Sequence, residues 1–362
     1  MSTEPDILPA SRVSLRSRRL GKLLFWTAYL AFLYLVMEGT ARTYWTLRWK
    51  TPFFGTADLK NGRFYPEVRK SGVLTTRITK DDGSYSILFL GGSVLTDDFG
   101  DIAPRLRRDL EAASGRSIRI FNCAGVAMTT RDSLIKYREF KSQAFDLLFI
   151  YEGLNDVRLN NFPPDRFKAD YSHNSWYHCL ARLDTHQEVG WTVLPFTFEY
   201  LAISIMDRVG SSRYQPRNRP VGGWKYNANE VLTAPSFRGN LTELIGLARQ
   251  RGAAVFLTTY AWYIPPDYDY AAFKARKLDY NYHLNPVEDW GAPGQVRAGL
   301  AVHNRILREV AREQHTLFVD LEPVIPRSRQ YFNDVCHLTP DGCKVFVQEI
   351  RGPILEQITV SR

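Results

Sequence analysis

Three side chains in this sequence could together activate a hydroxyl group as a nucleophile, although they lie far apart along the chain. Ser93 follows two glycines that end a short apolar run, and a sharp turn there would expose its hydroxyl. Asp334 precedes His337 by three residues, a spacing at which a carboxylate can orient an imidazole and stabilise its charged form. Each feature alone is common, because most Gly-Gly-Ser segments are only turns and most single histidines are structural. These residues indicate a serine nucleophile only if the segment of Ser93 and the segment of Asp334 and His337 meet in space.

Two further residues could donate hydrogen bonds to the oxyanion that such a nucleophile would create. Gly125 ends the sequence NCAG, where a glycine allows a backbone N–H to approach a ligand closely. Asn155 lies in the sequence GLND and carries a side-chain amide donor. Both residues also fit ordinary turns. However, Ser93, Gly125 and Asn155 each follow a separate apolar run, which is where a site is expected in a parallel sheet.

The four blocks together resemble the SGNH hydrolase family, also called GDSL esterases and lipases, whose name gives Ser, Gly, Asn and His in chain order. The matching positions are Ser93 in GGSV, Gly125 in NCAG, Asn155 in GLND and His337 in DVCHLTPDG. The resemblance extends from about residue 85 to residue 350 and implies a flavodoxin-like three-layer αβα sandwich. The sequence departs from the family where Gly92 stands in place of the usual Asp. This difference weakens the likeness to the namesake lipases and leaves the wider superfamily intact.

The resemblance implies a serine ester hydrolase that requires neither a metal nor a cofactor. Ser93 is then the nucleophile, His337 the general base, and Asp334 the residue that holds the imidazole in the useful tautomer. The resemblance also implies an oxyanion hole formed by the backbone N–H groups of Ser93 and Gly125 and the side-chain amide of Asn155.

Other residues near the expected strand ends or in long loops have weaker signals. Trp262 and Tyr263 follow the fourth apolar run, and we expect them either to wall the substrate pocket or to pack beneath a loop. His173 and His178 have no carboxylate at a metal-site spacing, so we expect them on the surface or in a lid.

The chain has four cysteines, and none forms a C-x-x-C pair, so no structural zinc site is expected. A disulfide between Cys123 and Cys336 is one of three possible ways to pair them if the compartment is oxidising.

Five short runs rich in β-branched and aromatic residues predict strands at 86–91, 117–121, 146–151, 253–260 and 316–320. Several are continuously apolar, which is typical of strands buried on both faces of a parallel sheet. Helical periodicity between them predicts helices at 101–113, 132–141, 237–250 and 295–314, with Asp132 as the N-cap of the second. The alternation predicts an α/β fold with a five-stranded parallel sheet and helices on both of its faces.

Residues 157–235 separate the third and fourth strands by a stretch too long for a simple crossover. The stretch contains a tryptophan-rich region around Trp176 and Trp191. Pro195 and Glu199 argue against a second membrane span within it. We consider two interpretations equally: a lid over the active site and an ordinary packed subdomain.

The amino-terminal segment has the pattern of a membrane anchor or an export signal. Residues 12–22 carry five basic residues, and 23–37 contain a single polar residue, Thr27, before Glu38. The charge bias favours a cytoplasmic amino terminus and an exported remainder. We therefore divide the chain into a basic cytoplasmic tail (1–22), a membrane anchor (23–41), a linker (42–83) and the hydrolase domain (84–362). The alternative is a cleaved signal, with small residues at 39–41, that would release a secreted enzyme.

Composition excludes several classes of protein. Hydrophobic residues make up 44% of the 362 residues and charged residues 23%, which excludes a chain that is mainly disordered or fibrous. The formal net charge of +9 favours an anionic surface such as a membrane or a charged polymer. No basic run interleaved with aromatic residues follows residue 22, so no nucleic-acid partner is expected.

The sequence therefore predicts an exported, membrane-tethered serine esterase that acts on a small-molecule or glycan ester. The alternative is an O-acyltransferase that uses the same triad to modify an extracellular polysaccharide or envelope glycan, which a water-excluding 157–235 segment would favour. A third possibility, a tethered binding module without catalysis, has no need of Ser93, Asp334 and His337.

Overall fold

The computed structural model describes residues 12–54, 58–209, 213–218 and 230–360, without the side chains of 12–18. Its centre is a five-stranded sheet in the order β2-β1-β3-β4-β5, with every neighbouring pair parallel, as the sequence predicts. The strands are β1 (Tyr85–Gly91), β2 (Ile118–Asn122), β3 (Leu147–Tyr151), β4 (Ala254–Thr258) and β5 (Leu317–Val319).

The register of the sheet brings the ends of its central strands together. Every residue of β1 and β3 is buried, which explains why their sequences are apolar without alternation. Phe89 of β1 lies opposite Asn122 of β2, and Gly91 lies opposite Tyr151 of β3. The segments that follow these three strands therefore leave the sheet at one edge, and this edge carries the predicted site.

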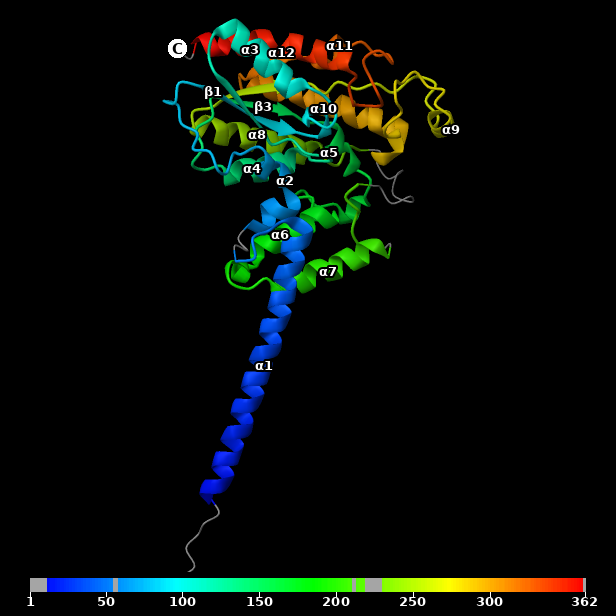
Figure 1. Cartoon of the computed structure of the whole chain (residues 1–362). Coiled ribbons are helices and arrows are strands. Elements are labelled where there is room, and N and C mark those ends of the chain that lie inside the picture. Colours follow the sequence, from blue (N-terminus) through cyan, green and yellow to red (C-terminus); the bar gives the residue numbers. More distant parts are fainter. Residues whose placement is uncertain (1–11, 55–57, 210–212, 219–229, 361–362) are drawn as a thin grey trace, which may run out of the picture.

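Helices cover both faces of the sheet (Figure 1). Helices α3 and α12 pack together on one face, and α4, α8 and α10 pack together on the other. The helices of this domain are α3 (Ile102–Ser114), α4 (Thr130–Glu139), α5 (Leu154–Arg158), α8 (Ala234–Gln250), α9 (Tyr270–Lys274), α10 (Pro293–Glu313), α11 (Leu321–Val324) and α12 (Pro340–Val360). The three-layer αβα sandwich is confirmed.

Helix α4 begins earlier than its sequence pattern predicts. Thr129, not Asp132, is its N-cap. The two residues form a capping box, in which the Thr129 side chain accepts the backbone N–H of Asp132 and the Asp132 side chain accepts that of Thr129. The Asp132 carboxylate accepts the N–H of Thr129 at 2.9 Å. The prediction of Asp132 as the N-cap was wrong because an Asp at the third helical position serves the same helix end equally well.

The described parts of segment 157–235, residues 157–209, 213–218 and 230–235, include helices that pack against the rest of the fold. Helices α6 (Ser175–Thr185) and α7 (Leu194–Arg208) of this subdomain contribute Trp176 and Tyr200 to a buried apolar cluster that extends to the main sheet. The amino-terminal elements η2 (Lys60–Phe64) and α2 (Pro66–Lys70) belong to the same cluster. Segment 42–83, predicted as a linker, is therefore largely packed into the fold.

One long helix, α1 (Arg12–Trp49), projects from the subdomain (Figure 1). It is long and apolar enough to cross a membrane. Most of the described side chains before Glu38 are exposed, whereas Glu38, Ala41 and Trp45 are buried against the subdomain. The predicted anchor and the first part of the predicted linker are thus one continuous helix.

Candidate active site

Ser93 lies immediately beyond β1, at the start of the short helical turn η3 (Ser93–Leu95). The backbone at Gly92 is extended, and a Cβ added there would lie 2.7 Å from Nδ2 of Asn155. No side chain fits at position 92 unless Asn155 moves. The glycine that departs from the GDS pattern therefore allows the amide of Asn155 to lie against the backbone that carries Ser93.

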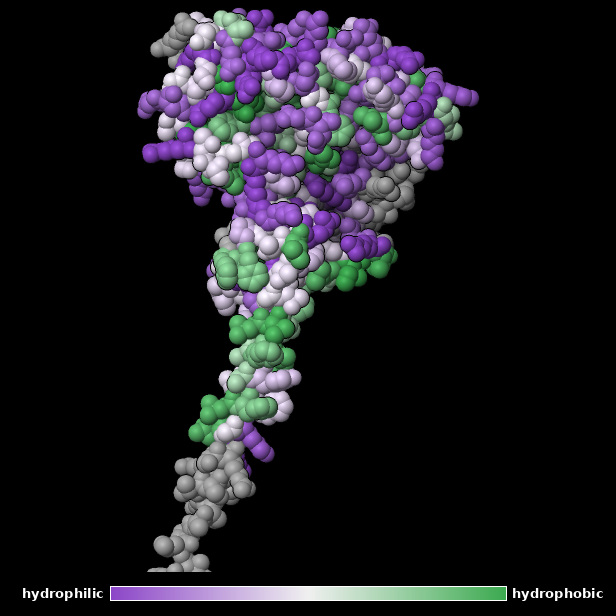
Figure 2. Space-filling model, in the orientation of Figure 1, coloured by the Kyte–Doolittle hydropathy of each residue, from purple (hydrophilic) through white to green (hydrophobic). Residues whose placement is uncertain are grey.

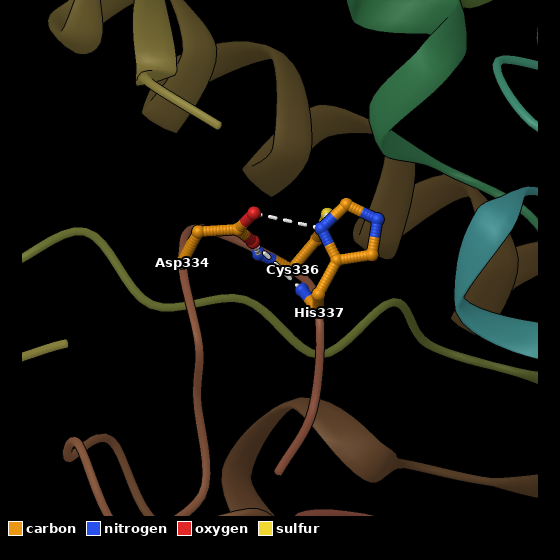
Figure 3. A group of neighbouring side chains, drawn as sticks. All are labelled: Asp334, Cys336 and His337. Carbon is orange, nitrogen blue, oxygen red and sulfur yellow. Dashed lines mark hydrogen bonds and ion pairs between the residues drawn. The ribbon is translucent and has the colours of Figure 1, made fainter. Parts of the chain in front are cut away.

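The structure brings Ser93, His337 and Asp334 together. Oγ of Ser93 is 2.9 Å from Nε2 of His337, and Nδ1 of His337 is 2.7 Å from Oδ2 of Asp334. All three side chains are at least nine-tenths buried. Figure 3 shows the imidazole with one nitrogen on the Asp334 carboxylate and the other directed away from it. The carboxylate accepts the Nδ1 proton, so the free Nε2 lone pair faces the Ser93 hydroxyl.

Three backbone N–H groups fix the Asp334 carboxylate in addition to the imidazole. Oδ1 accepts those of Cys336 at 2.9 Å and His337 at 2.8 Å, and Oδ2 accepts that of Asn285 at 3.1 Å. Asp334 and His337 are thus held in one tight turn of the loop before α12, and their spacing of three residues follows from this turn.

The environment of His337 also includes a ring contact that the sequence did not reveal. Phe99 stacks on the imidazole with ring centroids 4.3 Å apart. Burial opposes a charge on the imidazole, but the Asp334 carboxylate in contact with Nδ1 outweighs it, so the pKa of His337 is raised above its usual value.

Asp334, Cys336 and His337 form the one group of potential metal ligands found among the described residues. Both Asp334 oxygens already accept hydrogen bonds, and burial raises the pKa of the Cys336 thiol, which disfavours the thiolate that a metal would bind. This arrangement suits orientation of the imidazole better than metal binding.

All four cysteines are buried and free, so the disulfide considered between Cys123 and Cys336 is wrong. Sγ of Cys123 lies 3.3 Å from Oγ of Ser71, and Cys336 contacts the imidazole of His337 instead. The two cysteines follow different strands and face different neighbours.

The side chain of Asn155 is held in one orientation. Its Oδ1 accepts a hydrogen bond from Nε1 of Trp290 at 3.1 Å, and its Nδ2 donates to the carbonyl of Met128 at 2.8 Å. Because an indole N–H can only donate, it fixes which end of the amide is the oxygen. The second proton of Nδ2 remains available beside Gly92 and Ser93.

The structure gives the N–H of Gly125 a different partner from the predicted oxyanion. This N–H donates to the carbonyl of Gly91 at 3.1 Å and so continues the pairing of β2 with β1. Two residues later, Ala127 has a φ of 61°, in the left-handed region that L-residues rarely adopt. Such strain of a non-glycine residue concentrates at functional sites. Among the described residues, no backbone carbonyl accepts the N–H of Ala127.

A cleft of about 550 Å³ lies beside this edge of the sheet, next to Thr96 and Asp97 in the turn after Ser93, although Ser93 and His337 are not among its lining residues. Its walls come from the loops after β1 and β2, from segment 63–71 and from the subdomain. Charged and aromatic side chains dominate the lining, which includes Trp49, Arg63, Glu67, Lys70, Asp97, Asp98, Trp176 and Arg217. The guanidinium of Arg217 lies 3.3 Å from the ring centre of Trp176.

Trp262 and Tyr263 do not line this cleft. Nε1 of Trp262 donates to Glu322 at 3.0 Å, and the hydroxyl of Tyr263 donates to Asp279 at 3.0 Å. The N–H of Tyr263 donates to the carbonyl of Val335 at 2.9 Å, so this segment supports the loop that carries Asp334. Of the two interpretations of Trp262 and Tyr263, a pocket wall or packing beneath a loop, the structure favours packing beneath a loop.

His173 is buried, contrary to the expectation of a surface or lid residue. Burial lowers its pKa to about 4, so it is neutral near pH 7, and its Nδ1 accepts the N–H of Lys168 at 3.2 Å. His178 is half-buried and lies 3.1 Å from the hydroxyl of Tyr214. Both histidines are structural parts of the subdomain.

Comparison with known proteins places the chain in a family. The sequence profile of the GDSL-like lipase/acylhydrolase family matches residues 89–345. The chain belongs to this family. It is therefore a carboxylic ester hydrolase by class. A comparison with curated proteins found no match.

Solved structures similar to this chain include two hydrolases. A GDSL-like lipase from Bacteroides thetaiotaomicron is 14% identical, with a TM-score of 0.44, and the match covers 82% of this chain and 98% of the lipase. An acetylxylan esterase from Geobacillus stearothermophilus is 15% identical, with a TM-score of 0.41, and the match covers 78% and 96% of the two chains.

Proposed function

We propose that this ester hydrolase uses Ser93 as its nucleophile, with His337 as general base and Asp334 as the residue that orients the imidazole. The observation that carries the proposal is the unbroken chain of contacts from Oγ of Ser93 to Nε2 of His337 at 2.9 Å and from Nδ1 to Asp334 at 2.7 Å. A buried hydroxyl in contact with an imidazole that can accept its proton once the imidazole is deprotonated is the arrangement that makes serine nucleophilic.

In the proposed reaction, Oγ of Ser93 attacks the ester carbonyl carbon while Nε2 of His337 takes the hydroxyl proton. The carbonyl π electrons move to the oxygen, and when the tetrahedral intermediate collapses the alcohol leaves with the proton from His337. Water then repeats the sequence on the acyl-serine and releases the acid. The imidazole returns to its neutral form after each half-reaction, so no other reactant is consumed.

We infer that the oxyanion is bound by the N–H of Ser93, Nδ2 of Asn155 and the N–H of Ala127. Trp290 and Met128 hold the Asn155 amide against Gly92, the residue before Ser93. Ala127 replaces Gly125 in this proposal because the Gly125 N–H already has a partner in the sheet. Loss of one such donor typically lowers turnover about 10²–10³-fold.

The lining of the cleft supports a glycan ester as the substrate. Charged side chains such as Arg63 and Asp97 can bond sugar hydroxyls, and the rings of Trp49 and Trp176 can pack on sugar faces. Charged groups among the lining residues are less suited to a long acyl chain than a purely apolar wall would be. The proposed substrate is therefore a short acyl ester carried on a polysaccharide.

The contacts of α1 support an uncleaved anchor and an exported catalytic domain. Cleavage after Ala41 would remove Glu38, whose carboxylate accepts the backbone N–H groups of Val193 and Leu194 at the start of α7. The helix end would then lose its cap. The excess of basic residues before the apolar run supports a catalytic domain outside the cytoplasm.

The test uses the full chain in detergent, because α1 contributes buried residues to the subdomain. Hydrolysis is measured on nitrophenyl esters of increasing acyl length and on acetylated xylo-oligosaccharides. We expect acetate release, and a loss of about 10⁴-fold or more in the Ser93→Ala variant. Ser117→Ala is the matched control, since Ser117 is exposed at the opposite end of the sheet. Unchanged activity of Ser93→Ala would remove Ser93 from the mechanism.

The same assay separates hydrolysis from acyl transfer. With an unacetylated oligosaccharide added as acceptor, a hydrolase releases free acetate, whereas an O-acyltransferase forms the acetylated oligosaccharide in preference to acetate. We expect acetate as the main product.

A further inference from the structure

Helix α7 carries an apolar stripe that no described part of the protein covers. Trp191, Phe198, Leu201, Ile205 and Val209 are between 38% and 74% exposed. Trp191 precedes α7 and Val209 follows its last residue, and the spacing of three and four residues places Phe198, Leu201 and Ile205 on one side of the helix. Figure 2 shows hydrophobic surface along α7 next to the apolar part of α1. An exposed stripe of this kind on a helix normally marks an interaction surface.

The opposite side of α7 packs on the anchor helix. The ring of Trp45 in α1 lies 5.9 Å from that of Phe196 and 5.0 Å from that of Tyr200, and its Nε1 donates to Thr197 at 2.8 Å. Because α7 is apolar on both sides and only one side is packed, the exposed stripe is not accounted for by the fold.

Polar contacts fix the position of the start of α7 along the axis of α1. Glu38 accepts the N–H of Val193 at 3.0 Å and that of Leu194 at 3.1 Å, and the hydroxyl of Tyr34 donates to Thr192 at 2.6 Å. The start of α7 is therefore held beside the part of α1 between Tyr34 and Glu38.

Arg42 holds a second exposed aromatic segment at the same level. Its guanidinium donates to the carbonyl of Trp191 at 2.7 Å and to that of Phe53 at 2.8 Å. Phe54, the next residue, is 90% exposed. Aromatic side chains thus flank α1 on the Trp191 side and on the Phe54 side, next to the end of the apolar run.

The length of the anchor decides what covers these residues. The hydrocarbon core of a bilayer is about 30 Å thick, which requires about 20 helical residues. Counted from Lys22, such a span ends at about Arg42, beyond the point where α7 meets α1. The apolar region of the bilayer must therefore reach the level of Trp191, Phe54 and the α7 stripe.

We infer that α7 lies in the plane of the membrane interface and that its stripe, together with Phe54, is inserted into the lipid. The membrane-facing surface consists of Phe54, Trp191, Phe198, Leu201, Ile205 and Val209. Lipid is the occupant because this surface is continuous with a helix that spans the bilayer. Tryptophan at this depth and an exposed arginine, Arg208, in the last turn of α7 match the interface and its phosphate groups. The inference does not depend on the reaction at Ser93.

The test places an environment-sensitive fluorophore on the full chain in phosphatidylcholine nanodiscs that hold one protein each. Single variants Ile205→Cys and Phe54→Cys supply the labelling sites, and the native cysteines are buried. Val360→Cys is the control, because Val360 is 81% exposed at the end of α12. We expect blue-shifted emission at positions 205 and 54, and loss of most of that emission when the discs contain spin-labelled lipid. Position 360 should show neither effect.

Two results would overturn the inference. Emission typical of water at position 205 or 54, unaffected by spin-labelled lipid, would show that the surface is not in the membrane. A blue shift without lipid quenching would show that protein, not lipid, covers it. The readout involves no substrate, so an inactive enzyme would leave the outcome unchanged.

Discussion

At the scale of single residues, the site depends on how firmly His337 is held. Asp334 bonds its Nδ1 at 2.7 Å, Phe99 covers one face of its ring, and Ser93 lies 2.9 Å from its Nε2. These contacts select one tautomer and one orientation before substrate binds. A pre-oriented base loses little freedom in the reaction, and this is the main source of its efficiency.

The raised pKa of His337 sets the direction of the pH dependence. Only the neutral imidazole accepts the proton of Ser93, so kcat/KM should rise as the pH increases through the pKa of His337, above its usual value of about 6.5. In Asp334→Asn the stabilising charge is absent. The rising limb should move to lower pH, and kcat should fall about 10⁴-fold. A pH–rate profile of both proteins checks this, and a limb that stays in place would exclude Asp334 as the cause of the shift.

Gly92 gives a sharper test of the geometry at Ser93. Restoration of the family's usual Asp at this position, in Gly92→Asp, should lower kcat about 10²–10³-fold, because its Cβ would displace the amide of Asn155. Gly239→Asp is the matched control, since no atom lies near a Cβ added to that exposed helical glycine. Full activity of Gly92→Asp would mean that Asn155 does not act from its present position.

Most of the residues of the proposed site could be located from the sequence, but not all of them. Ser93, Asn155, Asp334 and His337 could be found because their types and order are specific. Ala127 could not, because no sequence pattern marks an alanine that adopts a positive φ. Phe99 likewise reaches the imidazole only through the turn after β1, and its sequence neighbours give no sign of that contact.

At the scale of elements, α1 is the proposed anchor and also a part of the fold. Glu38 bonds the start of α7, which lies about 155 residues further along the chain, and Trp45 packs on the same helix. Hydrophobicity predicted the apolar run correctly. The continuation of α1 to Trp49 and its packing on α7 could not be predicted, because periodicity within one helix does not reveal which tertiary partner its residues have.

Removal of the Glu38 carboxylate should loosen α7. In Glu38→Ala two backbone N–H groups and the guanidinium of Arg42 lose their acceptor, which should lower the free energy of unfolding by about 1–2 kcal/mol. Glu349→Ala, at an exposed position of α12, is the control. Thermal unfolding in detergent, followed by tryptophan fluorescence, measures the difference. Equal midpoints for the two variants would show that the cap contributes nothing.

At the scale of the whole molecule, α1 would set the distance between the cleft and the membrane in the proposed anchored form. Trp49, which lines the cleft, lies eleven residues beyond Glu38, or about 16 Å along the helix. The subdomain of α6 and α7 fills the space between the sheet and the membrane end of α1 (Figure 1). A substrate must therefore reach the site from the aqueous side.

This distance predicts that the substrate is a soluble molecule and not a membrane lipid. The full chain in nanodiscs should release acetate from soluble acetylated oligosaccharides and leave the phospholipids of the disc intact. Acetate and free fatty acid, measured in the same sample, give the comparison. Ser93→Ala discs report the background. Fatty acid released at a rate similar to that of acetate would contradict a cleft held above the bilayer.

The sheet could be predicted from the sequence, whereas the role of the segment between the third and fourth strands could not. The five apolar runs gave all five strands, because a parallel sheet buried on both faces leaves a clear signature in the sequence. The role of segment 157–235 was not predictable. Its Trp176 serves the core and the cleft at once, and burial of a tryptophan gives the same sequence pattern in a lid as in a packed subdomain.

The most direct measurement of the central claim is covalent trapping of the nucleophile. The full chain is treated with a fluorophosphonate, and the modified residue is identified by mass spectrometry of its peptides. We predict a single adduct on Ser93, formed in proportion to the loss of ester hydrolysis and absent from His337→Ala. Complete inhibition with the adduct on another residue, or full hydrolysis by a protein fully modified at Ser93, would contradict this account.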